Sequence, residues 1–366
     1  MNERGVSIII CCHNGALRLS ETVRHIALQI VPEDIRWEFL LVDNGSTDNS
    51  VAVAEAVWTA YYPSGRFRVV TEPILGLSHA RAKGFNEARY EFMLLCDDDN
   101  WLAPDYVKTA FDIMSERNAV GALGGLGTLY FETDPPPWIP NNTIFAAVGQ
   151  QDQPGKVRNN RIYGAGCVIR KSAYLELKRA GFKSFLHDRT GSSLTSGGDY
   201  ELCYALAILG YDIWYDDRLR FVHFITRERL TWNYFMKYAR ESCTCFDVLT
   251  SYKMVAAGLT AHEFPAVVIA RDFFYCLRKF AQIGIAMIFT QRSSRSRRTL
   301  YFRYTIFRNK IVTYVRKYRQ ICRQHREIMS LKKNCAKLKE VRSAGPAISL
   351  EAPASTFSLK PFPRPQ

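Results

Sequence analysis

The stretch FMLLCDDDNWLAPDY (residues 92–106) decides how the rest of this 366-residue sequence is interpreted. Residues 92–97 form a short apolar run, which predicts a buried β-strand. Asp97, Asp98 and Asp99 follow one another where that strand ends. Three like charges repel one another at this spacing, so we expect a cation, a cationic partner or full solvation to offset the repulsion.

Strands and helices alternate through the first hundred residues. Short apolar runs predict further strands at residues 6–11, 37–43 and 67–72, with helices at 17–30, 51–58 and 77–88. This alternation predicts an α/β fold with a mostly parallel sheet flanked by helices. Because ligands of such sheets bind at the carboxyl ends of the strands, one crevice should collect residues 11–14, Asp43 and the three aspartates.

The second half of the chain has a less regular pattern. It predicts a strand at 120–127, a strand leading into a helix at 161–174, a helix from about residue 199, short strands at 212–224 and a helix at 229–243. A proline-rich segment at residue 134 opens a loop that runs to about residue 160. Structureless loops of that length are uncommon unless they are functional.

Six motifs occur in an order and at spacings typical of one enzyme family. They are VSIIICCHNG, LLVDNGSTDNS, GLSHARAKGF, LLCDDDNWLAPDY, YGAGCVIRK and SGGDYELCYALAILGYDIWYD. The first two-thirds of the chain therefore resembles a family 2 glycosyltransferase of the GT-A fold, with a Rossmann-like sheet. The resemblance implies an inverting enzyme that moves one sugar from a nucleotide diphosphate sugar to an acceptor hydroxyl. It favours a UDP-sugar as donor, with a GDP-sugar as the alternative.

The resemblance also assigns the donor site. It implies contacts to the donor from Cys12, His13, Asn14, Asp43, Arg81, Asp97 and Asp98. Asp97 and Asp99 match the DxD pair, which with His223 would hold Mn²⁺ or Mg²⁺, cations that prefer hard oxygen ligands. The sequence departs from the family at His13, where an aromatic residue is common, and at Ala82, where asparagine is usual. Taken alone, the aspartates could instead form a solvated turn, and His223 could be structural.

The family needs a carboxylate base, and the resemblance implies that Asp199 takes this role. The family's Glu-Asp pair is replaced here by Gly198 and Asp199. A position at a helix start should lower the pKa of Asp199 and keep it ionised. The alternatives are that Asp199 only caps the helix, or that Glu201 is the base. We expect the base and the acceptor to lie within residues 141–224.

Several other residues could contact the diphosphate or the acceptor. Arg227 and Arg229 could hold phosphate oxygens, Asp188 and Arg189 could face the acceptor, and Trp138 could stack on a sugar ring. The segment TRERLTW departs from the QxxRW signature of processive polysaccharide synthases, which favours transfer of single sugars. A buried anchoring role for Trp138 is equally compatible with the sequence.

Basic residues are concentrated near the C-terminus. Residues 291–340 hold 16 Lys and Arg against two Glu, which accounts for the whole formal charge of +14. Aromatic and apolar residues alternate with these cations, a composition that favours a helix lying on an anionic membrane surface over packing alone or nucleic-acid binding. The longest uncharged run here, residues 280–291, is too short to span a bilayer. We expect a catalytic domain at 1–245, a helical extension at 246–342 and a disordered tail at 343–366.

The remaining expectations concern location and rival functions. Ten scattered cysteines without a CxxC pair, and an N-terminus without a signal-peptide pattern, indicate a cytoplasmic protein, peripheral on the inner face of the cell membrane. The acceptor would then be a lipid-linked saccharide used in surface polysaccharide synthesis. One rival is a sugar nucleotidyltransferase, although the glycine-rich loop such enzymes carry is missing from CCHNGALRLS. The other is an inactive membrane scaffold, which Gly198 would favour.

Overall fold

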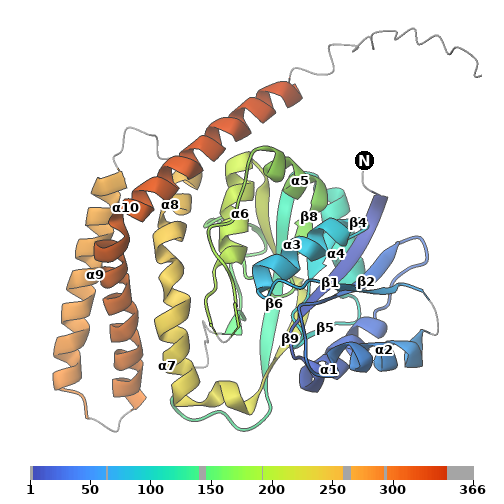
Figure 1. The fold of residues 1–366 in the computed structure, drawn as a ribbon, viewed down its shortest axis with the longest axis horizontal. Helices are drawn as coiled ribbons and strands as arrows, with labels where there is room; N and C mark the ends of the chain where they lie inside the picture. Colours follow the sequence, from blue (N-terminus) through green and yellow to red (C-terminus); the bar gives the residue numbers. More distant parts are fainter. Residues whose placement is uncertain are drawn as a thin grey trace, which may run out of the picture.

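A computed structural model describes residues 3–62, 65–139, 146–191, 193–258, 265–291 and 295–343. A central sheet with helices on both faces fills one half of the molecule, and long C-terminal helices stand beside it (Figure 1). The expected α/β class with a C-terminal helical basic extension is confirmed. The strands follow the order β3-β2-β1-β4-β8-β6-β9-β5, and β7 pairs with β9.

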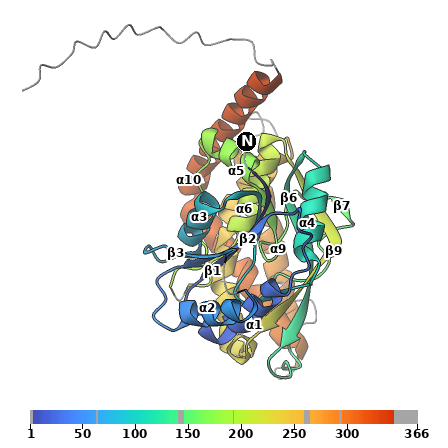
Figure 2. The ribbon, with the colours of Figure 1, turned by 90° about the vertical axis from the view of Figure 1, so that its right-hand side faces the viewer.

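The first half of the sheet is parallel. It contains β1 (Glu3–Cys12), β2 (Trp37–Asp43), β3 (Phe67–Thr71) and β4 (Tyr90–Leu95), separated along the chain by α1 (Ala16–Ala27), α2 (Ser50–Tyr61) and α3 (Leu77–Glu87). Ile8, Phe39 and Leu94 are fully buried, because β1, β2 and β4 are covered on both faces, whereas the edge strand β3 is half-buried. Figure 2 shows these strands nearly edge-on. Their carboxyl ends meet at one edge, where the aspartates lie.

The second half of the sheet is mixed. It contains β5 (Asn100–Leu102), β6 (Val120–Phe131), β7 (Gly155–Lys156), β8 (Val168–Arg170) and β9 (Asp212–Ile225), with α4 (Tyr106–Glu116), α5 (Lys171–Arg179) and α6 (Gly198–Leu209). Strand β8 runs antiparallel to both β4 and β6, so the parallel arrangement stops at β4. The short strands expected at 212–224 are one continuous strand, because β9 pairs along its length with β6.

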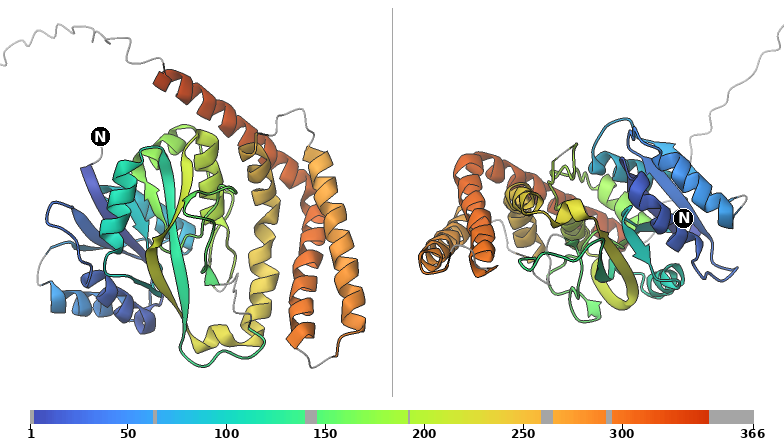
Figure 3. Two further views of the ribbon diagram at one scale, coloured as in Figure 1. Left: turned by 180° about the vertical axis from the view of Figure 1, so that it is seen from behind. Right: turned by 90° about the horizontal axis from the view of Figure 1, so that it is seen from below.

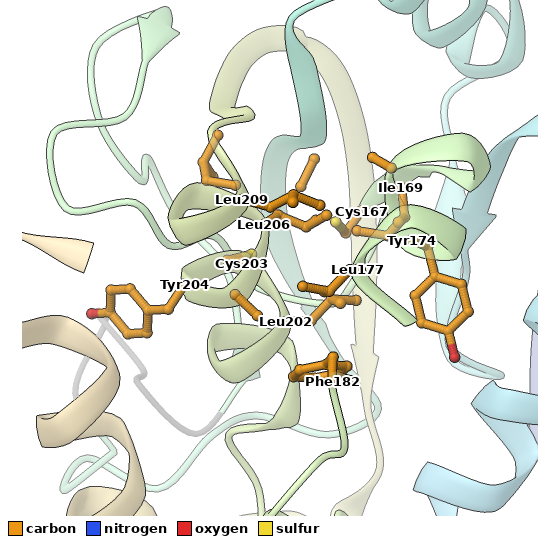
Figure 4. Packing of buried hydrophobic residues seen from close by; sticks show 14 of the residues in the cluster. Cys167, Ile169, Tyr174, Leu177, Phe182, Leu202, Cys203, Tyr204, Leu206 and Leu209 are labelled. Atoms are coloured by element: carbon orange, nitrogen blue, oxygen red, sulfur yellow. The ribbon is translucent and has the colours of Figure 1, made fainter. Parts of the chain in front are cut away.

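The C-terminal helices share their core with the sheet. They are η2 (Arg227–Leu230), α7 (Trp232–Glu241), η3 (Ser242–Cys245), α8 (Phe246–Ala256), α9 (Pro265–Ile288) and α10 (Arg295–Ser343). Buried side chains of α8 and α10, including Tyr252, Ile328 and Leu331, belong to the same cluster as Ile169 and Leu206. Figure 4 shows the centre of this cluster between α6 and α5. Figure 3 shows α9 and α10 as a hairpin, with α10 continuing past the body of the protein.

No helix among the described residues is long and apolar enough to cross a membrane. The tail expected to be disordered, residues 343–366, lies outside the described residues apart from Ser343, which ends α10.

Candidate active site

A large cavity lies at the carboxyl ends of the parallel strands and has a volume of about 1780 Å³. Most residues expected at the site line it: Cys12, His13, Arg81, Asp97, Asp98, Asp99, Trp138, Asp188, Arg189, Asp199, His223 and Arg229. These residues come from the ends of β1, β4 and β9, from two loops and from α3, α6 and η2, so the fold gathers distant parts of the chain. The cavity exceeds the roughly 300–1,000 Å³ typical of a site for one ligand.

Three expected residues do not line the cavity. Asn14 and Asp43 stabilise the neighbouring turns: Asn14 Oδ1 accepts the Thr47 N–H at 2.8 Å, and Asp43 Oδ1 accepts the Ser46 N–H at 3.1 Å. Arg227 is exposed and lies 3.4 Å from Glu132. Asn44, which follows Asp43, does line the cavity, and its backbone oxygen lies 2.9 Å from His13 Nδ1.

Asp99 is held between two basic side chains. Its Oδ2 accepts a hydrogen bond from Arg229 Nη1 at 2.8 Å, and its Oδ1 lies 3.3 Å from His223 Nε2. Burial alone would raise the pKa of Asp99, but His223 and Arg229 outweigh it and hold this pKa below its usual value. Asp99 therefore has the lowest pKa of the three aspartates and is ionised at neutral pH.

Asp98 has a separate cationic partner that sequence reasoning missed. Arg18 of α1 binds both of its carboxylate oxygens, through Nη2 at 2.6 Å and Nε at 3.3 Å. Arg18 also lines the cavity. It lies 80 residues away from Asp98, and no local pattern in the sequence marks it as part of the site. Asp98 and Asp99 therefore each have a cationic partner, and full solvation is excluded because both side chains are largely buried.

Asp97 differs from its two neighbours. Among the described residues its carboxylate has no hydrogen-bond or ion-pair partner. Burial raises the pKa of Asp97, and the charge of Asp99 raises it further, whereas Arg81 and His223 oppose the rise. A carboxylate in this position would be stabilised by an added cation.

The side chains available as metal ligands fit a divalent cation in part. Asp97 and Asp99 offer hard oxygen atoms, and the buried His223 Nδ1 has no partner in the described structure. However, Arg229 Nη1 lies between the Asp99 carboxylate and His223 Nε2, at 2.8 and 3.2 Å. No three His, Cys, Asp or Glu side chains of the described ranges form a group that could hold a metal by themselves. A Mg²⁺ or Mn²⁺ here would therefore take further ligands from substrate phosphates and water, as is usual for Mg²⁺.

Asp199 lies in the first turn of α6 and faces the cavity. Its Oδ2 accepts the Gly164 N–H at 2.8 Å, and its Oδ1 accepts the Tyr200 N–H at 2.9 Å. Burial raises the pKa of Asp199, and the Asp188 carboxylate adds to the rise. The expectation that the helix start lowers this pKa is wrong, because desolvation outweighs the N–H donors and Arg81.

The Asp188 carboxylate occupies the space that a side chain at position 198 would fill. Its side chain pairs with Arg81 at 2.8 Å, and its Oδ1 accepts the Gly198 N–H at 3.0 Å. A Cβ atom at Gly198 would lie 2.6 Å from Asp188 Oδ2, so only glycine leaves room for this carboxylate. Asp188 thus caps α6, the helix that carries Asp199, from a loop ten residues earlier in the chain.

The alternative base, Glu201, points away from the cavity. It is fully buried and does not line the cavity. Its carboxylate accepts hydrogen bonds from the Ser184 hydroxyl at 2.5 Å and the Phe185 N–H at 2.8 Å. Burial raises the pKa of Glu201 to about 7. These contacts fix the loop before α6.

Arginine and aromatic side chains from the loops, from η2 and from α7 line the side of the cavity next to Asp99. Arg229 and Arg189 lower the pKa of Tyr234 although its burial acts in the opposite sense, which indicates a positive field on this side of the cavity. Trp138 is half-buried, lines the cavity and packs against Trp232 with ring centroids 5.2 Å apart. Tyr234 and Trp232 were not expected at the site, because nothing in their helical pattern distinguishes them from core residues.

Comparison with known proteins agrees with the motifs. Residues 7–176 match the model of glycosyl transferase family 2. A segment of 146 residues is 29% identical to glycosyltransferase GlyG of Streptococcus pneumoniae, covering 40% of this chain and 44% of that protein. A segment of 95 residues is 32% identical to the cholesterol galactosyltransferase of Borreliella burgdorferi, covering 26% and 25%. The matches thus span less than half the length of these curated relatives.

A solved structure with similar architecture is the mannosyltransferase PcManGT from Pyrobaculum calidifontis in complex with GDP-Man and Mn²⁺. It is 14% identical, has a TM-score of 0.49, and the superposition covers 93% of this chain and 80% of that one. With the motifs, the parallel strands and the family match in view, residues 7–176 belong to glycosyl transferase family 2.

Proposed function

We propose that this chain is an inverting, non-processive glycosyltransferase that moves one sugar from a nucleotide diphosphate sugar to an acceptor hydroxyl. The observation that carries the proposal is that Asp199 lines the same cavity as Asp97, Asp98 and Asp99. The family match supports the transferase activity. A UDP-sugar remains the favoured donor and a GDP-sugar the alternative.

The proposed base is Asp199. The N–H groups of Gly164 and Tyr200 orient its carboxylate, which would accept the proton of the acceptor hydroxyl as that oxygen attacks C1 of the donor sugar. The bond between C1 and the phosphate oxygen breaks in the same step, and its electron pair leaves with the nucleoside diphosphate. Attack from the side opposite the leaving group inverts the anomeric centre. A raised pKa suits a base, because it makes the carboxylate a better proton acceptor.

Positive charge close to the aspartates would stabilise the leaving diphosphate. Arg229 and Arg189 supply a field that does not depend on the protonation state near neutral pH. A bound Mn²⁺ or Mg²⁺, held by Asp97 and Asp99 with His223 nearby, would neutralise further charge on the diphosphate. Arg18 restrains Asp98 on the donor side of the cavity.

The family's missing glutamate does not argue strongly for an inactive scaffold. Asp188 provides a carboxylate beside Gly198 and orders the start of α6. We further propose that the protein acts at the inner face of the cell membrane on a lipid-linked saccharide. The concentration of cations in residues 291–340 supports this location.

Two measurements test the proposal. Titration calorimetry with UDP, GDP and CMP, with and without Mn²⁺, should show metal-dependent binding of one nucleoside diphosphate. Asp199→Asn should reduce sugar transfer about 10²–10⁴-fold with donor affinity unchanged, because general-base catalysis contributes about that factor. Full activity of this variant would remove Asp199 from the mechanism, and absence of any nucleotide binding would favour the scaffold.

A further inference from the structure

The cavity does not end at the carboxylates. It continues between α7, α8, α9 and α10, the helices that Figures 1 and 3 show beside α6 on the side away from the sheet. Asp199 and the three aspartates line only one end of this cavity, whose volume is about 1780 Å³. The helical part therefore leaves room for a second ligand next to the base.

Three cations in the helical part have no anionic partner among the residues that the structure describes. Lys253 of α8, Arg271 of α9 and Arg303 of α10 line the cavity and are exposed. None of them has an ion pair or hydrogen bond from its side chain to any residue that the structure describes. The one carboxylate that α8, α9 and α10 add to the lining, Asp272, is already paired with Lys310 at 2.7 Å. This end of the cavity thus carries net positive charge from three helices.

Apolar side chains lie beside these cations. Leu249 and Met254 of α8 are buried, and Phe302, Ile306 and Phe307 of α10 are half-buried along the same cavity. The lining is therefore amphipathic, with cations next to an apolar wall. A ligand that matches it has an anionic group attached to a hydrocarbon chain.

We infer that the helical part of the cavity binds the acceptor through a phosphate group and an adjoining hydrocarbon chain, so that the acceptor is a saccharide carried on a lipid phosphate. This inference rests on the proposed function, because it assigns the second ligand to the sugar acceptor. The phosphate is held by Lys253, Arg271 and Arg303, and the chain lies along Leu249, Phe302 and Ile306. The saccharide hydroxyl then points toward Asp199, which lines the same cavity.

Three probes separate charge from apolar contact: farnesyl diphosphate, farnesol and inorganic diphosphate, each titrated into the full-length protein by calorimetry. Farnesyl diphosphate should bind more tightly than either of the others. The double variant Lys253→Gln/Arg303→Gln should weaken it at least tenfold, and Ile306→Gln should reduce its advantage over inorganic diphosphate. The matched control Arg308→Gln/Arg316→Gln removes two exposed α10 cations that do not line the cavity and should leave its affinity unchanged.

Other outcomes overturn the inference in distinct ways. Equal affinity for farnesyl diphosphate and inorganic diphosphate would exclude the hydrocarbon site and indicate a soluble phosphate ester. Equal affinity for farnesol would exclude the anion site. Binding to phosphatidylglycerol vesicles that is lost in Lys253→Gln/Arg303→Gln, without farnesyl diphosphate binding, would mean that these cations contact a membrane instead.

The donor site is tested separately. Asp99→Asn should leave farnesyl diphosphate binding intact while it weakens metal-dependent nucleotide binding. If nucleotide binding fails in the wild-type protein and farnesyl diphosphate binding persists, the proposed transferase is wrong and the anionic lipid site remains.

Discussion

Gly198→Ala is a sensitive test of the arrangement at the start of α6. Replacing glycine by alanine within a helix ordinarily stabilises a protein by about 0.5–1 kcal/mol. Here the new Cβ would lie 2.6 Å from Asp188 Oδ2 and 3.1 Å from its Cγ. The Asp188 side chain cannot rotate away freely, because Arg81 and the Gly198 N–H hold it at 2.8 and 3.0 Å.

The expected cost follows from what must move. Overpacking a buried position costs about 1–3 kcal/mol, and loss of a hydrogen bond to a charged group costs about 1.5–3 kcal/mol. Against the usual gain for alanine, we expect a net loss of about 1–2 kcal/mol in the free energy of unfolding. Transfer activity should fall as well, because Asp199 is the next residue along the chain.

Urea unfolding followed by circular dichroism measures the change. Gly284→Ala is the matched control, since Gly284 lies within α9 and its nearest contact for a Cβ is Tyr304 Cε2 at 3.9 Å. This variant should be stabilised by about 0.5–1 kcal/mol. In an Asp188→Ala background, Gly198→Ala should lose its penalty, because the opposing carboxylate is gone. If Gly198→Ala is as stable as Gly284→Ala, Asp188 does not occupy this space and the reasoning fails.

Further predictions concern ionisation and the metal. Burial and Asp188 raise the pKa of Asp199 above 3.8, so transfer activity should be lost on the acidic side of the pH–rate profile with a midpoint above that value. Asp188→Asn should move this midpoint to lower pH. The pH–rate profiles of both proteins would check this, and identical midpoints would contradict it. Glu201 has its pKa raised from 4.5 to about 7, so the folded state retains a proton that the unfolded state loses, and stability should fall as the pH rises through this window. Glu201→Gln should abolish that fall and keep transfer activity, whereas a large loss of activity would return Glu201 to the list of bases. Asp99→Asn should weaken Mn²⁺-dependent nucleotide binding at least about tenfold by calorimetry, and unchanged binding would remove Asp99 from the metal site.

The sequence predicted the regular part of the fold well, and the reason is physical. The strands at 37–43 and 67–72 and the helix at 77–88 agree with β2, β3 and α3 to within a residue at each end. The apolar pattern is clearest in β2, which is almost fully buried, as expected for a strand covered on both faces. The β8 strand is only three residues long and depends on pairing with β4 and β6 on either side, so its direction could not be read from local pattern. The short β5 was missed for the same reason, since it exists through its pairing with β9.

The site, like the fold, has residues that the sequence could predict and residues that it could not. Residues at strand ends, such as Asp97 and Asp99, could be placed from topology alone. The partners that set their charge could not, because Arg18 and Arg229 lie 80 and 130 positions away in sequence from the aspartates they bind. The pKa of Asp199 was expected to fall and instead rises, since the sequence reveals a helix start but not the depth at which it is buried.

Helix α10 contributes both to the cavity and to the core, and this limits which sequence changes in the C-terminal region the protein can tolerate. The helix has 49 residues, about 70 Å at the usual rise, and one stretch of it lines the cavity while another completes the core through Ile328, Leu331 and Cys335. A truncation that removes the cationic stretch also exposes apolar surface on α6 and α8. Shortened chains should therefore aggregate before they report on lipid binding, and divergence of the C-terminal region should proceed by point substitution on the cavity side of α10 and not by loss of the whole helix.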